Sequence, residues 1–331
     1  MTITFIGAGS WGTALSTIPA AKGHRINVFD IDEPHLRRME EAMENVDYLP
    51  GVKLDGDYNF YTNNEEALKD ADVVVFSLPA QIFRIALKSA LPFIPEKAIV
   101  MNIAKGIEQK TLKRMSEVAE EVFDMDRYVV LSGPSHAEEV GIGMPTTVSV
   151  ACRNSDNANF IQELFGCDYF RIYTNDDIVG LELGGSLKNV LAVGSGIIHG
   201  LGYGDNTRAA MMTRGIAEMT RLGTALGAKA ETFAGLSGIG DLIVTCTSQH
   251  SRNFRCGDLI GQGMDPEEAR KEIGMVVEGM FTAEAAVELA HRSNVEMPIS
   301  EAIYKAITGH IDVKEAMIQL MGRPYKKEIV G

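Results

Sequence analysis

The first twelve residues, MTITFIGAGSWG, restrict the possible folds more than any other segment. An apolar segment typical of a buried strand runs directly into Gly7, Gly9 and Gly12, and a helix-like segment follows. In this spacing the first glycine permits a tight turn, the second lets a pyrophosphate approach the backbone, and the third allows close helix–strand packing. The helix N-terminus then faces the anion. The motif predicts a dinucleotide-binding turn; a glycine-rich turn without a ligand is the alternative, which the strand–turn–helix context disfavours.

A carboxylate, Asp30, ends the next apolar segment about 20 residues further on, as this motif requires. A carboxylate at that place accepts hydrogen bonds from the adenosine ribose hydroxyls, which favours NAD. Asp32 and Glu33 follow directly and could take the same role, and Asp30 could also be an ordinary surface carboxylate.

Short apolar segments alternate with helical patterns through the first half of the chain, which indicates a parallel sheet covered on both faces. We expect strands at 3–8, 25–30, 71–78, 98–103, 128–133, 146–152 and 169–174. We expect helices at 10–22, 33–44, 81–90, 111–123 and 158–165.

After Asn175 the strand patterns stop and the pattern is helical, at 176–201, 207–226, 259–262, 266–274, 282–292, 299–308 and 313–321. The fold class is therefore expected to be an α/β dinucleotide-binding domain followed by an all-α domain. We place the dinucleotide-binding domain at 1–175 and the helical substrate domain at 176–331. The crevice between two domains is the default ligand site.

The formal net charge of −14 repels phosphate backbones, so we expect no nucleic-acid partner. The four cysteines form no C-x-x-C pair, which argues against a zinc or redox motif and favours free thiols in the cytoplasm. No removable leader and no membrane-spanning apolar run is evident, and no carboxylate–histidine cluster has metal-ligand spacing. We therefore expect a cytoplasmic protein without a metal.

Lys188 interrupts the small and apolar run GGSLKNVLAVG, and a buried ammonium group is costly unless something pairs with it. On a helix its neighbours are mostly small, among them Gly184 and Gly185, which would leave room for a ligand, and Asn189 could orient a polar group. Desolvation can lower a lysine pKa and suit it to proton transfer. A structural lysine paired with a buried carboxylate is the equally weighted alternative.

Further polar residues favour the catalytic interpretation. Asp241 and Thr245 share a helix face, and Ser251, Arg252 and Asn253 form a hydroxyl–guanidinium–amide group at an expected helix start, suited to phosphate. Lys105 and the segment 132–135 follow two strands, where α/β sheets bind ligands. Solvated charges and an ordinary turn are the alternatives.

In this order the residues resemble the NAD(P)-dependent sn-glycerol-3-phosphate dehydrogenases of the soluble bacterial type, over nearly the whole chain. The motifs that carry the resemblance are GAGSWGTAL, YLPG, AKG, SGPS, GGSLKNVLAVGSG, TRGIAEM, GLSGIGDLIVTCTSQHSRN, GQG, VVEG and EMPI. The resemblance implies a Rossmann-like domain plus a helical domain. It also implies interconversion of dihydroxyacetone phosphate and sn-glycerol 3-phosphate, supplying phospholipid synthesis, and it allows for a homodimer.

The resemblance also implies roles for individual residues. Lys188 is then the catalytic acid–base. The substrate-binding residues are Lys105, Gly133, Ser135, Lys188, Asp241, Thr245, Ser251, Arg252 and Asn253. The cofactor-binding residues are Gly7, Gly9, Ser10, Trp11, Gly12, Asp30, Lys105, Ala137, Arg252, Val276 and Glu278.

Two positions depart from the family pattern. Ile31 stands where many relatives have a basic residue suited to a 2′-phosphate, so we expect NAD(H) to be preferred, with NADP(H) possible. His136 stands where phenylalanine is usual, and the sequence offers no account of it. Another hydroxyacid-type dehydrogenase and a catalytically silent NAD-binding regulator are rival interpretations. The pairing of the Asp241–Thr245 and Ser251–Asn253 motifs argues against the first, and the combination of Lys105, Lys188 and Asp241 argues against the second.

Overall fold

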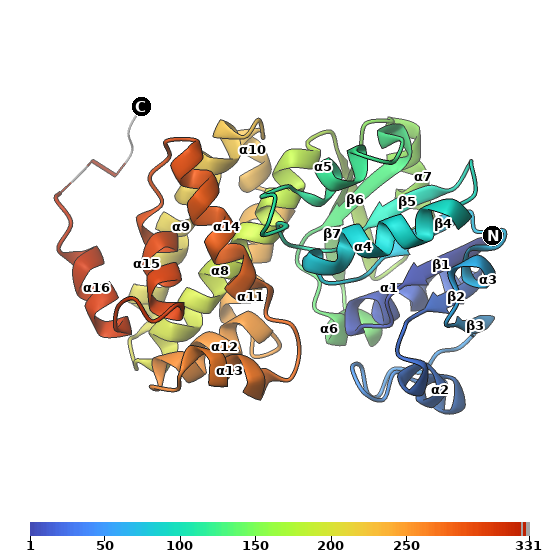
Figure 1. Cartoon of the computed structure of the whole chain (residues 1–331), viewed down its shortest axis with the longest axis horizontal. Coiled ribbons are helices and arrows are strands. Elements are labelled where there is room, and N and C mark those ends of the chain that lie inside the picture. The colour runs from blue at the N-terminus through green and yellow to red at the C-terminus, as the bar shows by residue number, and fades with distance from the viewer. Residues whose placement is uncertain (326, 329–331) are drawn as a thin grey trace.

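The computed structural model describes residues 1–325, 327 and 328. An N-terminal domain built on an eight-stranded sheet is followed by a helical domain, as the sequence predicts (Figure 1). The strands lie in the order β3-β2-β1-β4-β5-β6-β7-β8. Their bounds are β1 Thr2–Ile6, β2 Arg25–Phe29, β3 Tyr58–Tyr61, β4 Val73–Phe76, β5 Ile99–Asn102, β6 Tyr128–Ser132, β7 Thr146–Cys152 and β8 Phe170–Asn175.

The sheet departs from expectation in two places. The edge strand β3 was not expected, because all of its residues are partly exposed and give no apolar run. Strand β7 pairs antiparallel with β6, with Val129 opposite Cys152, whereas the other neighbouring strands are parallel. Only the short helix α6 (Ala137–Gly141) lies between β6 and β7, so the chain turns back instead of making the long crossover of a parallel pair.

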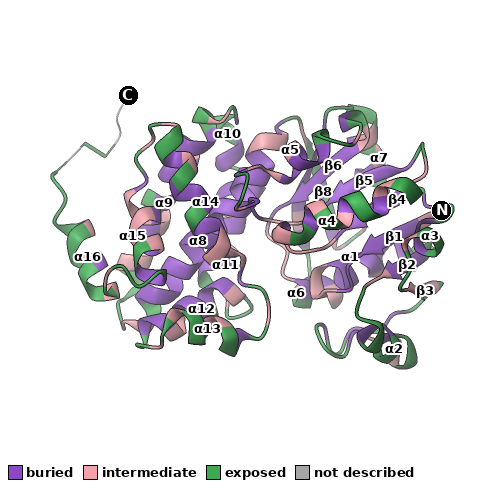
Figure 2. Cartoon of the chain, in the orientation of Figure 1, coloured by how far each residue is buried: buried purple, intermediate pink, exposed green. Residues whose placement is uncertain are grey.

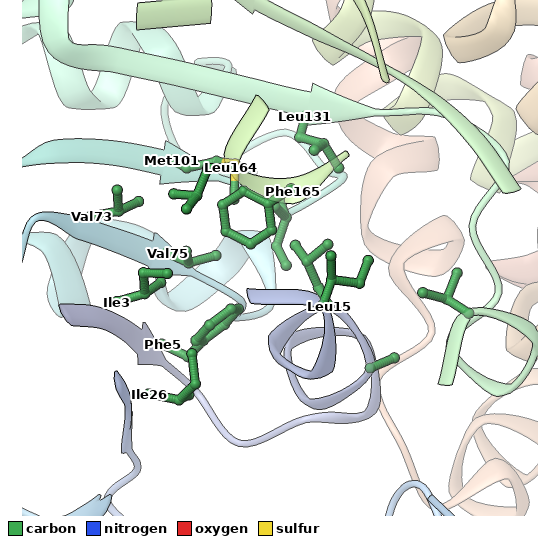
Figure 3. Packing of buried hydrophobic residues seen from close by; sticks show 14 of the residues in the cluster. Ile3, Phe5, Leu15, Ile26, Val73, Val75, Met101, Leu131, Leu164 and Phe165 are labelled. Atoms are coloured by element: carbon green, nitrogen blue, oxygen red, sulfur yellow. The ribbon is translucent and has the colours of Figure 1, made fainter. Parts of the chain in front are cut away.

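Helices cover both faces of the sheet. They are α1 Ser10–Ala21, α2 Glu33–Ala42, α3 Asn64–Leu68, α4 Ala80–Ala90, α5 Met115–Glu120, α6 and α7 Ser155–Phe165, with 3₁₀ turns η1 Leu91–Phe93 and η2 Met125–Arg127. Val73 and Val75 of β4 pack with Leu15 and Phe165 on one face (Figure 3). The intervening residues of β4 belong to a second cluster on the other face. This alternation explains why β4 reads as an uninterrupted apolar run.

The helical domain follows directly. Its elements are α8 Ile178–Gly200, α9 Asp205–Ala225, α10 Ala230–Phe233, a π-helical turn η3 Leu236–Gly240, α11 Asp241–Thr247, α12 Arg252–Gly261, α13 Pro266–Ile273, α14 Glu278–Arg292, α15 Pro298–Ile307 and α16 Val313–Met321. Because β8 ends at Asn175 and α8 begins at Ile178, we propose that the domain boundary falls between them. No helix in the described residues combines the length and the apolar character needed to cross a bilayer.

Several predicted helix bounds were wrong. The helix expected at 111–123 is only α5, because Leu112 has a left-handed φ of 61° and Arg114 bridges to Ile107. The short helix expected at 259–262 is the end of α12, and the helix expected at 282–292 begins at Glu278. The short helices α3, α6 and α10 were not expected, since four or five residues give no helical period.

Helix α8 is the centre of the helical domain, and every residue from Gly180 to Ile198 is buried (Figure 2). Its glycines let α12 approach backbone to backbone. A Cβ atom on Gly196 would lie 2.0 Å from the carbonyl oxygen of Phe254, and one on Gly257 would lie 2.0 Å from that of Val193. This close crossing sets the position of the α12 N-terminus relative to Lys188.

Candidate active site

Lys188 of α8 is paired with a buried carboxylate. Its side chain is 7 % exposed, and Nζ donates to Oδ1 of Asp241 at 2.7 Å and to Oγ1 of Thr245 at 2.6 Å. Asp241 and Thr245 lie on one face of α11, as their spacing predicts. The partner explains how an ammonium group is tolerated in an apolar helix.

A second lysine reaches the same carboxylate from the sheet domain. Lys105, just beyond β5, donates from Nζ to Oδ2 of Asp241 at 2.8 Å and to the carbonyl oxygen of Gly133 at 2.7 Å. Oγ of Ser135 lies 3.5 Å from the same Nζ. The ends of β5 and β6 and the helices α8 and α11 therefore meet at one point, with Asp241 between the two lysines.

The small residues beside Lys188 do not simply leave room for a ligand, as their pattern suggested. A Cβ atom on Gly184 would lie 2.4 Å from the carbonyl oxygen of Ser237, and one on Gly185 would lie 2.7 Å from Oγ of Ser132. Protein therefore packs against both glycines, and their role includes the close contact of α8 with η3 and the sheet domain.

Burial and charge shift the pKa values of this group in a way that suits proton transfer. Burial, with the nearby charge of Lys105, lowers the pKa of Lys188 to about 8, although Asp241 opposes the shift. Burial alone would raise the pKa of Asp241, but the charges of Lys105 and Lys188 hold it below its ordinary value. Asp241 thus stays ionised while Lys188 can exchange a proton near neutral pH.

Three of the expected substrate residues also have structural partners. Oγ1 of Thr245 donates to the carbonyl oxygen of Asp241 at 2.6 Å. Oγ of Ser251 caps α12 by accepting from the N–H of Phe254 at 3.2 Å. The Asn253 amide donates to Oδ1 of Asn189 at 3.0 Å and accepts from the N–H of Gly279 at 2.8 Å.

Asn189, which the sequence placed as a ligand-orienting residue, joins the two domains instead. Its side-chain nitrogen donates to the carbonyl oxygen of Lys105 at 3.1 Å, while its oxygen accepts from Asn253. The loop that carries Lys105 is thereby fixed to α8 and, through Asn253, to the start of α12.

Arg252, the first residue of α12, is half-buried. In the part of the chain described here, its guanidinium forms no hydrogen bond or ion pair, and burial lowers its pKa against the opposing charges of Glu278 and Glu138. A desolvated guanidinium at a helix N-terminus, without a carboxylate partner of its own, is suited to bind a phosphate group.

The glycine turn has the geometry that its motif predicts. Gly7 has a φ of 103°, and a Cβ atom on Gly12 would lie 2.3 Å from Oγ of Ser77. Helix α1 starts at Ser10 with Gly9 as its N-cap, and no side chain caps it, so the first-turn amides of Ser10 and Trp11 face outward for an anion.

Asp30 already accepts two backbone hydrogen bonds, from the N–H of Ala8 at 2.8 Å to Oδ2 and from that of Asp32 at 3.1 Å to Oδ1. Each carboxylate oxygen can accept a second hydrogen bond, so a ribose hydroxyl remains compatible with this geometry. The neighbouring Ile31 side chain is 86 % exposed.

The remaining expected cofactor residues come from several elements of both domains. Glu278 of α14 accepts at Oε1 from the N–H of Ala80, at the start of α4, at 3.0 Å. Its Oε2 is buried without a partner, as is Nε1 of Trp11. Burial raises the pKa of Glu278 to about 7, so this carboxyl can accept or donate a hydrogen bond near neutrality. Ala137 begins α6 and is buried, whereas Val276 is partly exposed before α14.

Sequence reasoning missed Ala80, whose N–H donates to Glu278, although its place after a parallel strand was a signal. Ser132, in the segment expected to bind ligands, has a buried hydroxyl without a partner beside Gly185. His136, for which the sequence offered no account, crosses between the domains: its Nε2 lies 3.4 Å from the carbonyl oxygen of Val244, and burial lowers its pKa. Among the described residues, no cluster of His, Cys, Asp and Glu is arranged to hold a metal ion.

Comparison with known proteins agrees with this geometry. The family profile of the NAD-dependent glycerol-3-phosphate dehydrogenase N-terminus matches residues 2–158, and that of the C-terminus matches residues 177–318. A glycerol-3-phosphate dehydrogenase [NAD(P)+] of Carboxydothermus hydrogenoformans is 51% identical over 329 residues, covering 99% of this chain and 98% of that protein. The Bacillus subtilis protein of the same name is 47% identical, covering 97% and 94%.

A solved structure shows the same fold. The crystal structure of glycerol-3-phosphate dehydrogenase from Coxiella burnetii has a TM-score of 0.94 and 36% identity, covering 97% of this chain and 99% of that one. The chain described here belongs to the NAD-dependent glycerol-3-phosphate dehydrogenase family.

Proposed function

We propose that this protein interconverts dihydroxyacetone phosphate and sn-glycerol 3-phosphate with a nicotinamide dinucleotide, and that Lys188 is the acid–base. The supporting observation is the lysine–carboxylate–lysine cluster between the domains, beside the unpartnered guanidinium of Arg252. Relatives that match nearly the whole chain carry the name of this activity. A silent NAD-binding regulator would not need a cluster with these pKa shifts.

The glycine turn and the uncapped N-terminus of α1 would bind the cofactor phosphates. Asp30 would bind a ribose, and Glu278 would bind the nicotinamide end. Their fit rests on the free amides of α1 and on the unpartnered Oε2 of Glu278. When bound, the nicotinamide donates or accepts the hydride at the carbinol carbon.

The chain's own residues then handle charge and proton. Lys188 Nζ stabilises the oxygen that becomes the alcohol and delivers a proton to it, and it takes that proton back in the oxidation direction. Asp241 holds Nζ in place and remains ionised. Arg252 fixes the phosphate, so that binding energy far from the reacting carbon orients it. We expect the remaining substrate contacts to come from Lys105, Gly133, Ser135, Thr245, Ser251 and Asn253.

We further propose that the enzyme works in the cytoplasm and supplies glycerol phosphate for phospholipid synthesis. All four cysteines are free thiols, as a reducing compartment maintains them. A requirement for external glycerol after loss of the gene would test the metabolic role.

Replacement of Lys188 tests the proton-transfer role. We expect Lys188→Met to lower turnover by about 100-fold or more. With a pKa of about 8, the parent should reduce the ketone more slowly as the pH rises through that value, because the ammonium form is the acid. It should oxidise the alcohol faster over the same range, because the neutral amine is the base. Steady-state rates in both directions measure this, with Lys110→Met as the exposed control. Turnover within a few-fold of the parent would remove Lys188 from the mechanism.

Replacement of Arg252 tests the substrate. NADH oxidation should follow addition of dihydroxyacetone phosphate and not of glyceraldehyde 3-phosphate or an acetoacetyl thioester. Arg252→Ala should weaken the phosphorylated ketone by about 1.5–3 kcal/mol, as for a hydrogen bond to a charged group, and leave the weak activity on dihydroxyacetone nearly unchanged. Equal losses on both ketones would show that Arg252 does not bind the phosphate.

Cofactor choice can be tested at the turn after β2. Nearby basic side chains are occupied: Arg37 pairs with Glu33, Arg38 with Asp47, Arg25 with Asp57, and Lys22 donates to carbonyl oxygens in the last turn of α7. We therefore expect kcat/KM to favour NADH over NADPH. Ile31→Arg should raise NADPH use by about tenfold, the scale of one charge-assisted contact, without disturbing the Asp30–Ala8 bond. Asp30→Ala with Ile31→Arg should also weaken NADH. A parent that prefers NADPH would refute the assignment.

We also propose that two copies pair through the far end of the helical domain. Helices α8, α9, α15 and α16 surround an apolar cavity of about 1060 Å³, and α16 stands apart from the body (Figure 1). Ile318 and Met321 of α16 are 71% and 80% exposed. Sedimentation velocity should show a dimer for the parent and a monomer for Ile318→Glu with Met321→Glu. The control Ile85→Glu, on the exposed face of α4, should stay dimeric; a monomeric parent would refute this pairing.

A further inference from the structure

Side chains hold both the backbone N–H and the backbone carbonyl of Ala8, inside the glycine turn. Oδ2 of Asp30 accepts from its N–H at 2.8 Å. Its carbonyl oxygen lies 3.1 Å from Nε2 of His35 and accepts from Nδ2 of Asn45 at 2.8 Å. A loop carbonyl with two buried side-chain donors is fixed in direction, because both of its lone-pair positions are used.

His35 is itself locked in place. It is 2% exposed, its Nδ1 lies 2.7 Å from Oδ2 of Asp47, and its backbone N–H donates to Asp32 at 3.0 Å. Arg38 donates to the same Asp47 oxygen at 2.6 Å. A carboxylate and a carbonyl oxygen can only accept, so both ring contacts are hydrogen bonds when both nitrogens carry a proton.

We propose that His35 is a positioning residue for the dinucleotide: by holding the Ala8 carbonyl it turns the Gly9 N–H toward the pyrophosphate site. In a planar trans peptide the N–H of Gly9 points opposite to the C=O of Ala8. In the described part of the chain this N–H has no acceptor, and the space beside Gly9 is open, with Ser77 the nearest neighbour at 4.0 Å from a hypothetical Cβ. The inference rests on the proposed function in requiring a dinucleotide as ligand.

Binding is measured with ADP-ribose, which has the pyrophosphate and no nicotinamide, and with NADH, by quenching of the chain's single tryptophan, Trp11, in the first turn of α1. We expect His35→Phe to weaken both ligands by about tenfold or more, the scale of a lost hydrogen bond to a charged group. His35→Gln, which keeps one N–H donor, should recover part of the loss. The melting temperature and kcat at saturating NADH should change little, and the exposed control His291→Gln should match the parent.

The carboxylate partner of the ring gives a second readout. Asp47→Asn keeps His35 and removes the carboxylate that orients its ring, so it should weaken ADP-ribose in the same direction as His35→Phe, even if His35→Phe does not fold.

The outcomes separate this inference from the proposed function. A parent that binds neither NADH nor ADP-ribose would overturn both. A parent that binds both, together with variants of His35 that bind them within twofold of the parent, would overturn the positioning role alone.

Discussion

The ion pairs of Asp241 are the interaction on which the arrangement of both domains depends. A buried carboxylate is costly, and here two lysines compensate it, Lys188 from the helical domain and Lys105 from the sheet domain. Moving either lysine would remove one of the two ion pairs that compensate this buried carboxylate. The same contact joins the domains and opposes the burial that lowers the pKa of Lys188 to about 8. The structural and catalytic interpretations of Lys188 are both supported by one geometry.

The sheet brings its contributors to one edge. The glycine turn follows β1, Lys105 follows β5 and Gly133 follows β6, all at carboxyl ends of parallel strands. The strand order changes direction between β1 and β4, where α/β sheets bind ligands. Lys105 and Lys188 around Asp241 leave a local positive excess in a chain of net charge −14, so an anion would be held by local rather than overall charge.

The parts of this architecture that the sequence predicted are those encoded locally. The glycine turn, the apolar strands and the Asp241–Thr245 helix face each depend on a few consecutive residues. The antiparallel β7 was not predictable in this way, because direction depends on the short connection and not on the strand's own apolar pattern. The Asn189–Asn253 and Asp30–Ala8 hydrogen bonds each connect residues that are far apart in the chain. Neither the composition nor the hydrophobic periodicity of the sequence indicates them. The small residues of α8 could be recognised in the sequence, but their contacts with η3 and α12 could not be predicted from it.

Two ionisable groups of the proposed site differ in charge. Arg252 is cationic and stands at the α12 N-terminus, whereas Oε2 of Glu278 is buried on a carboxyl with a pKa of about 7. Burial dominates the shift at each, and each group's field opposes the other's shift, lowering the pKa of Glu278 and raising that of Arg252. The neighbouring lysines already pair with Asp241. Under the proposed function, Arg252 would bind a phosphate and Oε2 of Glu278 an amide, and this difference in charge would orient the bound substrate and cofactor.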